Sequence, residues 1–313
     1  MTGTSTSFVP VIDCSVLRTD PADPALTEQI EEACRDFGGF VASGCELTAT
    51  GEAFRQARRF FELPEEARRA VAADHNNRGW TEHRSETSHG REPDVKEAFQ
   101  VGCDLGSEHP LVRAGVPLHG PNRWPELPGF QVGVESLFEQ IQGLCRGLSV
   151  PLARGLGLDS DGLCKHLAEP YASMRLHRYR MVEPETPRTG DEFGHAPHTD
   201  FGLLGIVVQE EGAGLQAERG GEWVDVPGGG DLITVIVGDL LAWWSGGRYR
   251  ALRHQVPTPR QRDRYSIAAF VNPAFNRSLH PLNNAEAQPQ RCGKFILNAA
   301  HGSKPLRPVR TAR

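Results

Sequence analysis

Apolar residues recur at helical spacing near the start of the chain. Asp23 suits an N-cap, and Pro24 suits the first helical position. The residues that follow at intervals of three or four positions, and so share one helix face, are Leu26, Ile30, Ala33 and Phe37. This pattern predicts an amphipathic helix over residues 24–37, preceded by a short strand at residues 8–14.

The same periodicity predicts three more helices. Residues 54–61 carry a second one, and Pro64 opens a short third one. The strongest apolar stripe of the chain runs over residues 130–148 and predicts a long helix. Between these segments, residues 74–94 are polar and predict a long loop, and loops of this length are often functional.

The pattern changes after about residue 170. Short runs rich in β-branched and aromatic residues are separated by Gly, Pro and Asp: SMRLHRYRM, LLGIVVQE, GLQAE, EWVDVP, DLITVIVGD, RALRHQVPT and RYSIAAFVN. Short strands at this spacing are typical of antiparallel sandwiches and barrels. The chain is therefore predicted to be α+β, with helices first and a mainly β core afterwards, in one cooperative domain.

The composition narrows the classes of function. The 313 residues are 38% hydrophobic and 24% charged, and a formal net charge of −6 does not favour nucleic acid or an anionic membrane. The N-terminus lacks the features of a secretory signal, and no apolar run is long enough to cross a bilayer. Seven cysteines without C-x-x-C spacing argue against a disulfide framework or a thiolate zinc site. We expect a cytoplasmic protein.

The segment HAPHTDFG at residues 195–202 contains a candidate metal site. On a strand, residues i and i+2 face the same way, so His198 and Asp200 can direct one nitrogen and one oxygen to the same ion. His254, in a later predicted strand, is the natural third ligand. Two histidines and one carboxylate leave coordination positions open, which suits ferrous iron that binds O₂ and a co-substrate. His195 is interpreted as a loop residue outside the site.

A second group of polar residues follows ten positions after His254. Arg264 and Ser266 share one face of the predicted strand RYSIAAF, where a guanidinium and a hydroxyl can hold a carboxylate. Taken singly, the His-x-Asp pair would suit a cap and the Arg-x-Ser pair an ordinary salt bridge. Together they predict an open metal site beside a carboxylate clamp, and hence a co-substrate that chelates the metal and carries a distal carboxylate.

The order and spacing of these residues resemble the iron(II)/2-oxoglutarate-dependent dioxygenases of the isopenicillin N synthase-like family. The likeness covers most of the chain and includes FVPVID (8–13), RGW (78–80), DVKEAFQVG (94–102), PNRWPELPGF (121–130) and GLQAERGGEWVDVPGGGDLITVIVGDLL (214–241). The stretch from RAGVPLHGPNRWP through the metal motif resembles the bacterial ethylene-forming-enzyme-like oxygenases in particular.

The resemblance implies a fold and a set of ligands. The family fold is a double-stranded β-helix, or jelly roll, flanked by N-terminal and central α-helices. The residues implied as Fe(II) ligands are His198, Asp200 and His254, and those implied to hold the C5 carboxylate of 2-oxoglutarate are Arg264 and Ser266. Tyr179 matches a tyrosine that often assists this clamp, and His177 occupies a position near the oxoacid end that is commonly asparagine.

The implied activity is an Fe(II)- and 2-oxoglutarate-dependent oxygenase that uses O₂. It would oxidise a polar small molecule by hydroxylation, desaturation or oxidative cyclisation, in bacterial secondary metabolism. Two alternatives stay open at this point. Some relatives use the arginine–serine pair to hold their own substrate and need no 2-oxoglutarate, and the triad alone would also suit a zinc hydrolase.

Four residues are candidates for contact with the substrate. Phe201 follows Asp200 directly, and Phe270 shares a strand face with Arg264. Arg84 and Glu86 lie in the polar loop that could cover the site. Each also has a plainer interpretation, as core packing for Phe270 and as a solvated loop for Arg84 and Glu86. A small molecule is the expected partner, without nucleic acid or membrane, and we expect a monomer.

The predicted domain organisation is a single catalytic domain over residues 1–313. It comprises an N-terminal helical and strand region (1–130), a long helix and jelly-roll core with the metal site (131–275), and a C-terminal tail (276–313). Residues 291–313 carry six Lys or Arg and no acid. This composition predicts a solvated tail or, alternatively, a lid over an anionic substrate.

Overall fold

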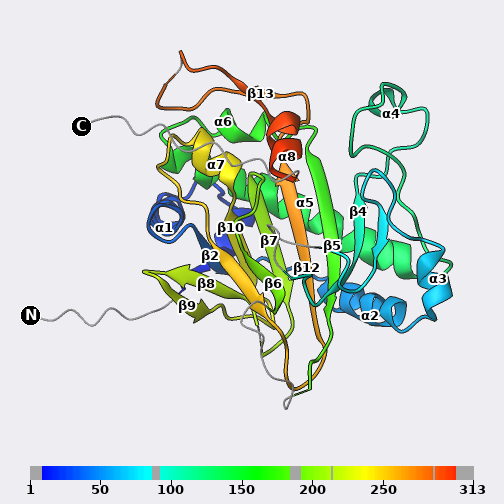
Figure 1. Ribbon diagram of the computed structural model, residues 1–313. Helices are drawn as coiled ribbons and strands as arrows, with labels where there is room; N and C mark the ends of the chain where they lie inside the picture. The colour runs from blue at the N-terminus through cyan, green and yellow to red at the C-terminus, as the bar shows by residue number, and fades with distance from the viewer. Residues whose placement is uncertain (1–8, 87–91, 184–191, 213, 285, 301–313) are drawn as a thin grey trace, which may run out of the picture.

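Two β-sheets form the centre of the molecule in the computed structural model, which describes residues 9–86, 92–183, 192–212, 214–284 and 286–300 (Figure 1). Within these residues the larger sheet has eight strands, in the spatial order β1 (Val11–Asp13), β2 (Gly39–Ser43), β10 (Ile233–Val237), β7 (Leu204–Gln209), β12 (Arg264–Asn272), β5 (Tyr171–Tyr179), β4 (Glu97–Gly102) and β3 (Gly79–Thr81). The smaller has four, in the order β6 (Phe193–His198), β11 (His254–Pro257), β8 (Gln216–Arg219) and β9 (Glu222–Asp225). A separate short pair joins β13 (Ser278–Leu279) and β14 (Gln290–Arg291).

Helices cover the outer face of the larger sheet. The longest, α5 (Phe130–Gly155), runs behind the sheet in Figure 1, with α1 (Pro24–Asp36) and α2 (Thr50–Phe61) near its two ends. One apolar core joins these helices to the sheet, and its members include Ile30, Phe60, Ile141 and Ile267. The remaining helices are η1 (Ser15–Arg18), α3 (Glu65–Arg69), α4 (Pro110–Arg113), α6 (Asp161–Cys164), α7 (Asp239–Trp244) and α8 (Cys292–Ala300).

A second apolar core fills the space between the two sheets. Val41, Val207 and Ala268 of the larger sheet belong to it, together with Ala217 and Val256 of the smaller one. The larger sheet is thus buried on both faces, and eight of the nine residues of β12 are buried. Burial on both faces explains why β12 and β7 are near-continuous apolar runs rather than alternating ones.

The predicted helices are largely confirmed. α1 begins at Pro24, and the side chain of its N-cap Asp23 accepts a hydrogen bond from the backbone N–H of Leu26 at 2.7 Å. The long helix, in contrast, was predicted too short. α5 continues seven residues beyond Leu148 to Gly155 and includes Pro151, because buried residues of its last turns pack into the core and outweigh the cost of the proline.

Three further predictions are corrected by the fold. The polar segment 74–94 is not a continuous loop, because it contains β3, which pairs with β4 just after the segment. The sheet is not wholly antiparallel, since β1 and β2 run parallel. The C-terminal tail is not solvated throughout: Cys292, Phe295 and Ile296 are buried, whereas residues 301–313 lie outside the described residues. Among the helices described, none is long and apolar enough to span a membrane.

Candidate functional site

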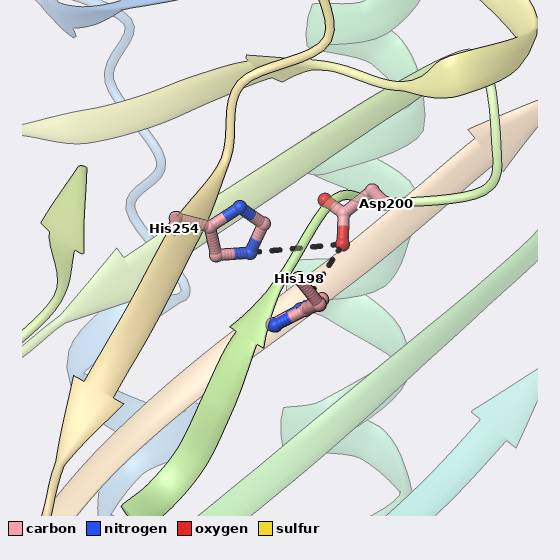
Figure 2. A group of neighbouring side chains, drawn as sticks. All are labelled: His198, Asp200 and His254. Atoms are coloured by element: carbon pink, nitrogen blue, oxygen red, sulfur yellow. Dashed lines mark ion pairs between the residues drawn. The ribbon is translucent and has the colours of Figure 1, made fainter. Parts of the chain in front are cut away.

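Two histidines and an aspartate converge between the two sheets (Figure 2). His198 ends β6 and His254 begins β11, and the two are direct partners in the antiparallel pair. The Nε2 atoms of both histidines lie 3.7 Å from Asp200 Oδ1. One potential ligand atom from each of the three residues lies within 4.8 Å of the other two, which is close enough for all three to bind one ion.

Asp200 reaches this position by a different route from the one predicted. It lies in the turn that follows β6, not on a strand with His198. His198 and Asp200 therefore lie together as predicted, but not as residues i and i+2 of one strand. The carboxylate faces the histidines because the chain leaves β6 and crosses to β7, and this crossing packs Asp200 against the larger sheet.

Backbone carbonyls fix the orientation of both imidazoles. His198 Nδ1 lies 2.8 Å from the carbonyl oxygen of Ala196, and His254 Nδ1 lies 3.0 Å from that of Leu252. In each ring the Nδ1–H donates to the carbonyl, which leaves Nε2 as the basic nitrogen toward Asp200. Metal-binding histidines in proteins are held in this way.

The Asp200 carboxylate is buried, and burial raises its pKa. Its Oδ1 faces the two histidines, while Oδ2 has no hydrogen-bond partner among the described residues. A Cβ added at Gly205 would lie 2.3 Å from Oδ2, so the absence of a side chain there makes room for the carboxylate. A buried carboxylate that lacks hydrogen-bond donors or a counter-charge lowers the stability of the fold unless it binds a cation.

His195 was interpreted as a loop residue, and this is wrong. It lies within β6 and its side chain lines the pocket described below. Its ring stacks on that of His198, with 3.9 Å between centroids, and its Nε2 lies 3.7 Å from Asp94 Oδ2. Burial and the nearby His198 hold the pKa of His195 well below its ordinary value. His195 therefore supports the triad as a neutral neighbour and is not a member of it.

The triad faces a pocket between the two sheets. One wall of the pocket consists of alternate residues of β5 and β12, which pair antiparallel over their whole length. Cross-strand partners form three successive steps of this β5–β12 wall: Tyr179 with Arg264, His177 with Ser266, and Arg175 with Ala268. Phe270 lies one step further along β12 and also lines the pocket.

Arg264 occupies the first step of the wall and is 7% exposed. Its guanidinium carbon lies 4.6 Å from the ring centroid of Tyr179, and its Nη2 donates to Gln209 Oε1 at 2.9 Å. Burial lowers the pKa of the guanidinium and Tyr179 raises it. An arginine stays charged even at such a site. Ser266 is buried on the same strand face, so a charged fork and a hydroxyl are available to a carboxylate.

His177 occupies the second step of the wall. Within the described residues, neither of its ring nitrogens has a hydrogen-bond partner. Burial is the main cause that holds the pKa of His177 well below its usual value, and the positive charges of Arg175 and Lys96 add to it. The ring is therefore neutral and offers one donor and one acceptor. Buried polar groups are normally hydrogen-bonded, and this step of the pocket therefore suits a polar ligand.

The candidate substrate residues divide into two groups. Phe270 lines the pocket, as its strand face predicted. Phe201, Arg84 and Glu86 do not line it: Phe201 is 36% exposed, Arg84 pairs with Glu192, and Glu86 pairs with Arg175. Arg175, which does line the pocket, was missed. It lies two and four residues before His177 and Tyr179, so strand alternation was the signal that would have identified it.

Comparison with known proteins identifies the family. The 2OG-Fe(II) oxygenase superfamily matches residues 171–273, and a family described as non-haem dioxygenase in morphine synthesis N-terminal matches residues 9–127. The 2-oxoglutarate-dependent dioxygenase tropC of Talaromyces stipitatus is 31% identical over 298 residues, which cover 88% of this chain and 90% of the relative. The chain belongs to the 2OG-Fe(II) oxygenase superfamily.

Other members are similarly related along their whole length. The 2-oxoglutarate-dependent dioxygenase thnC of Trichoderma harzianum is 30% identical, and the match covers 92% of each chain. Homoarginine-6-hydroxylase 2-ODD-C23.1 of Arabidopsis thaliana is also 30% identical, with 88% of this chain and 87% of the relative covered. The more specific likeness to bacterial ethylene-forming-enzyme-like oxygenases is not confirmed by these relatives.

Solved structures show the fold. A full-length Neurospora crassa protein, solved in complex with alpha-KG, superposes with a TM-score of 0.81 at 23% identity, covering 94% of this chain and 96% of that one. A 2OG-Fe(II) oxygenase family protein of Caulobacter crescentus gives 0.82 at 21% identity, with 96% and 100% covered. The predicted α+β class, with a jelly-roll core flanked by helices, is confirmed.

Family membership and the geometry agree on the cofactors. The protein is an Fe(II)- and 2-oxoglutarate-dependent dioxygenase, and its Asp200 Oδ2 and His177 ring nitrogens are the buried polar atoms that such ligands would satisfy. Two histidines and one carboxylate are the donor set that suits ferrous iron with open positions. The alternative of a zinc hydrolase is excluded by the family, and a 2-oxoglutarate-independent oxidase is not supported.

Proposed function

We propose that His198, Asp200 and His254 hold Fe(II), and that Arg264, Ser266 and Tyr179 hold the distal carboxylate of 2-oxoglutarate. The observation that carries this assignment is that both groups line one pocket although they come from four separate segments of the chain: β5, β6 with the residues just after it, β11 and β12. His177 lies opposite Ser266 on the β5–β12 wall, one step from Arg264, and we assign it to the oxoacid end of the co-substrate.

The chain itself supplies positioning and a dry pocket. When bound, Fe(II) and 2-oxoglutarate supply the oxidising chemistry, with O₂ consumed and succinate and CO₂ released. Arg264 fixes one end of the co-substrate through its planar donors, and the backbone carbonyls behind His198 and His254 hold both rings for the metal. Apolar side chains of the pocket, among them Val207, Leu215 and Val256, exclude water from the reaction.

The substrate is proposed to be a polar small molecule. The pocket combines apolar residues with a few polar groups that fix orientation, as small-molecule sites commonly do. Hydroxylation is the outcome that we favour over desaturation or oxidative cyclisation, because a relative that is 30% identical is named homoarginine-6-hydroxylase. A role in bacterial secondary metabolism and a cytoplasmic location remain predictions from the sequence.

Measurements of Fe(II) and 2-oxoglutarate binding test this proposal. Asp200→Ala should abolish Fe(II) binding and the visible band that forms on anaerobic addition of Fe(II) and 2-oxoglutarate. Arg264→Lys should retain Fe(II) but raise the Kd of 2-oxoglutarate about 10- to 100-fold, because lysine keeps the charge and loses the two-donor fork. His166→Ala, which removes a histidine outside the pocket, is the matched control.

Two results would contradict the assignment. Wild-type Fe(II) affinity in Asp200→Ala would place the metal elsewhere. Unchanged 2-oxoglutarate affinity in Arg264→Lys, with the band intact, would assign Arg264 to the substrate or to structure.

A further inference from the structure

Arg175 is a charged residue of the pocket that the assignments above do not use. It lies at the third step of the β5–β12 wall, opposite Ala268, while Arg264 lies at the first. Ala268 pairs on its other side with Val207 of β7. Gly205, two residues away on β7, contacts the Asp200 carboxylate. Arg175 is therefore at the metal end of the pocket, and Arg264 is at the opposite end.

The guanidinium of Arg175 is only partly engaged by the protein. Its Nη2 donates to Glu86 Oε1 at 2.7 Å. Its Nε is buried and has no hydrogen-bond partner within the described residues, although the side chain as a whole is 17% exposed. Arginine binds a carboxylate best through two parallel N–H donors, and Arg175 retains a donor for this purpose.

A buried ion-pair network holds Arg175 from behind. Lys96 is 3% exposed at its side chain, and its Nζ lies 2.8 Å from Asp94 Oδ2 and 3.7 Å from Glu86 Oε2. Burial alone raises the pKa of Glu86, but Arg175 and Lys96 outweigh it and lower this pKa to about 2. Glu86 is therefore ionised and fixes the direction of Arg175. Such second contacts are what keep a binding group in its productive position.

Of the arginine and aspartate side chains that line the pocket, two are positive (Arg175 and Arg264) and one, Asp200, is negative. Among the causes that lower the pKa of the neighbouring His177 are the charges of Arg175, Lys96 and Arg264, and only Arg175 and Arg264 of these line the pocket. Because burial reduces dielectric screening, a guanidinium with an unused donor attracts an anion more strongly here than at the surface. A planar carboxylate matches both its charge and its donor geometry.

We propose that Arg175 is a second carboxylate-binding residue of the pocket, held at the metal end by Glu86. The inference rests on the proposed function, because the metal end is defined by the assigned triad. The carboxylate that Arg175 binds has one of two sources: the oxoacid end of 2-oxoglutarate, or a carboxylic acid group of the substrate. Both sources require the same chemistry from the residue.

Two variants and two controls isolate this role. Arg175→Gln removes the charge, and Arg175→Lys keeps it without the fork. Glu86→Gln removes the partner of Arg175 but leaves the guanidinium in place. Arg178→Gln changes an arginine of the same strand that does not line the pocket and that pairs with Asp263 at 2.6 Å.

Two binding measurements distinguish the sources of the carboxylate. In the first, calorimetry under anaerobic conditions gives the Kd of 2-oxoglutarate for the Fe(II)-loaded protein. In the second, the protein loaded with Fe(II) and 2-oxoglutarate is melted with a set of aromatic acids and amino acids, L-homoarginine and benzoate included, each beside its primary amide. Neither measurement depends on turnover.

A rise of at least about tenfold in the Kd of 2-oxoglutarate for Arg175→Gln, with Arg178→Gln unchanged, identifies the co-substrate as the source. The second source is the substrate. It is identified if acids, but not their amides, raise the melting temperature of wild type, and if Arg175→Gln loses this rise. In whichever of the two measurements responds, Arg175→Lys should lose part of the binding effect that Arg175→Gln loses, and Glu86→Gln should lose a smaller part.

Three outcomes would overturn the proposal. In the first, the Kd of 2-oxoglutarate stays within about twofold in Arg175→Gln and no acid-specific stabilisation is lost. In the second, Arg175→Gln reduces the rise in melting temperature equally for acids and for their amides. In the third, Glu86→Gln weakens ligand binding as much as Arg175→Gln does, which would assign the effect to the ion pair between the two residues. A wild-type protein that binds neither Fe(II) nor 2-oxoglutarate would instead contradict the proposed function itself.

Discussion

Gly205 makes room for the metal-binding carboxylate by having no side chain. Its position on β7 places a hypothetical Cβ 2.3 Å from Asp200 Oδ2, well inside van der Waals contact. The backbone of Gly205 does not have the positive φ that would itself require glycine. The tightest constraint is therefore the close approach of Asp200, since the other neighbour, Ile236 Cβ, would lie at an ordinary contact distance of 3.4 Å.

We predict that Gly205→Ala folds but binds Fe(II) about 10- to 100-fold more weakly, because the methyl group displaces the carboxylate. Anaerobic Fe(II) titration measures this affinity. Gly147→Ala is the control, since a Cβ there meets open space in helix α5. Wild-type Fe(II) affinity in Gly205→Ala would show that Asp200 can move aside without loss.

At the scale of single elements, hydrogen bonding and burial decide where helices begin and end. α1 begins where its sequence predicts, because the Asp23 carboxylate accepts a hydrogen bond from an otherwise unpaired N–H of the first turn. α5 does not end where its stripe weakens, because its last turns are buried against the rest of the protein. Local signals thus fix α1, whereas tertiary packing fixes the end of α5.

Asp23→Ala is expected to lower the free energy of unfolding by about 1 kcal/mol, the usual cost of losing an N-cap. Chemical denaturation measures the change. Asp36 lies at the opposite end of the same helix and is exposed, where an acid is unfavourable to the helix dipole. Asp36→Ala should therefore leave stability unchanged or slightly raised, and an equal loss in both variants would rule out the capping explanation.

At the scale of the whole molecule, the two sheets bring distant segments to one pocket. β6 and β11 of the smaller sheet carry the histidines, while β5 and β12 of the larger sheet carry the carboxylate-binding residues. This arrangement buries the Asp200 carboxylate, whose Oδ2 has no hydrogen-bond partner among the described residues. The fold therefore gives up stability at the site for function.

The metal-free form of Asp200→Asn should melt at a higher temperature than metal-free wild type at neutral pH. Burial raises the folded-state pKa of Asp200 above its unfolded value, so the cost of the charge is full above the folded-state pKa, shrinks as the pH falls below it, and is gone below the unfolded-state pKa. The asparagine removes that cost.

Fe(II) should reverse this order. At 100 times its Kd, a ligand of the native state stabilises wild type by about 2.7 kcal/mol, and Asp200→Asn should show no such gain. Differential scanning calorimetry with and without Fe(II), under anaerobic conditions, measures both effects. A metal-free Asp200→Asn that melts below metal-free wild type would show that the carboxylate stabilises the fold.

Much of the candidate site was predictable because it depends on residue types in a fixed order. His198, Asp200, His254 and Arg264 were identified from spacing and from the strands expected around them. Strand alternation also placed Phe270 correctly, since every second residue of β12 faces the pocket. Phe201 was misplaced because the turn after β6 has no such alternation and leaves its ring partly exposed.

The sequence by itself determined most of the elements, the ligand types and the family resemblance, because local periodicity and motif spacing are properties of short segments. Only the tertiary structure decided that Asp200 lies beyond its strand, that Gly205 makes room for it, and that Arg175 faces the metal end with Glu86 behind it. These depend on contacts between segments far apart in the chain, such as Glu86 and Arg175, for which no local pattern exists.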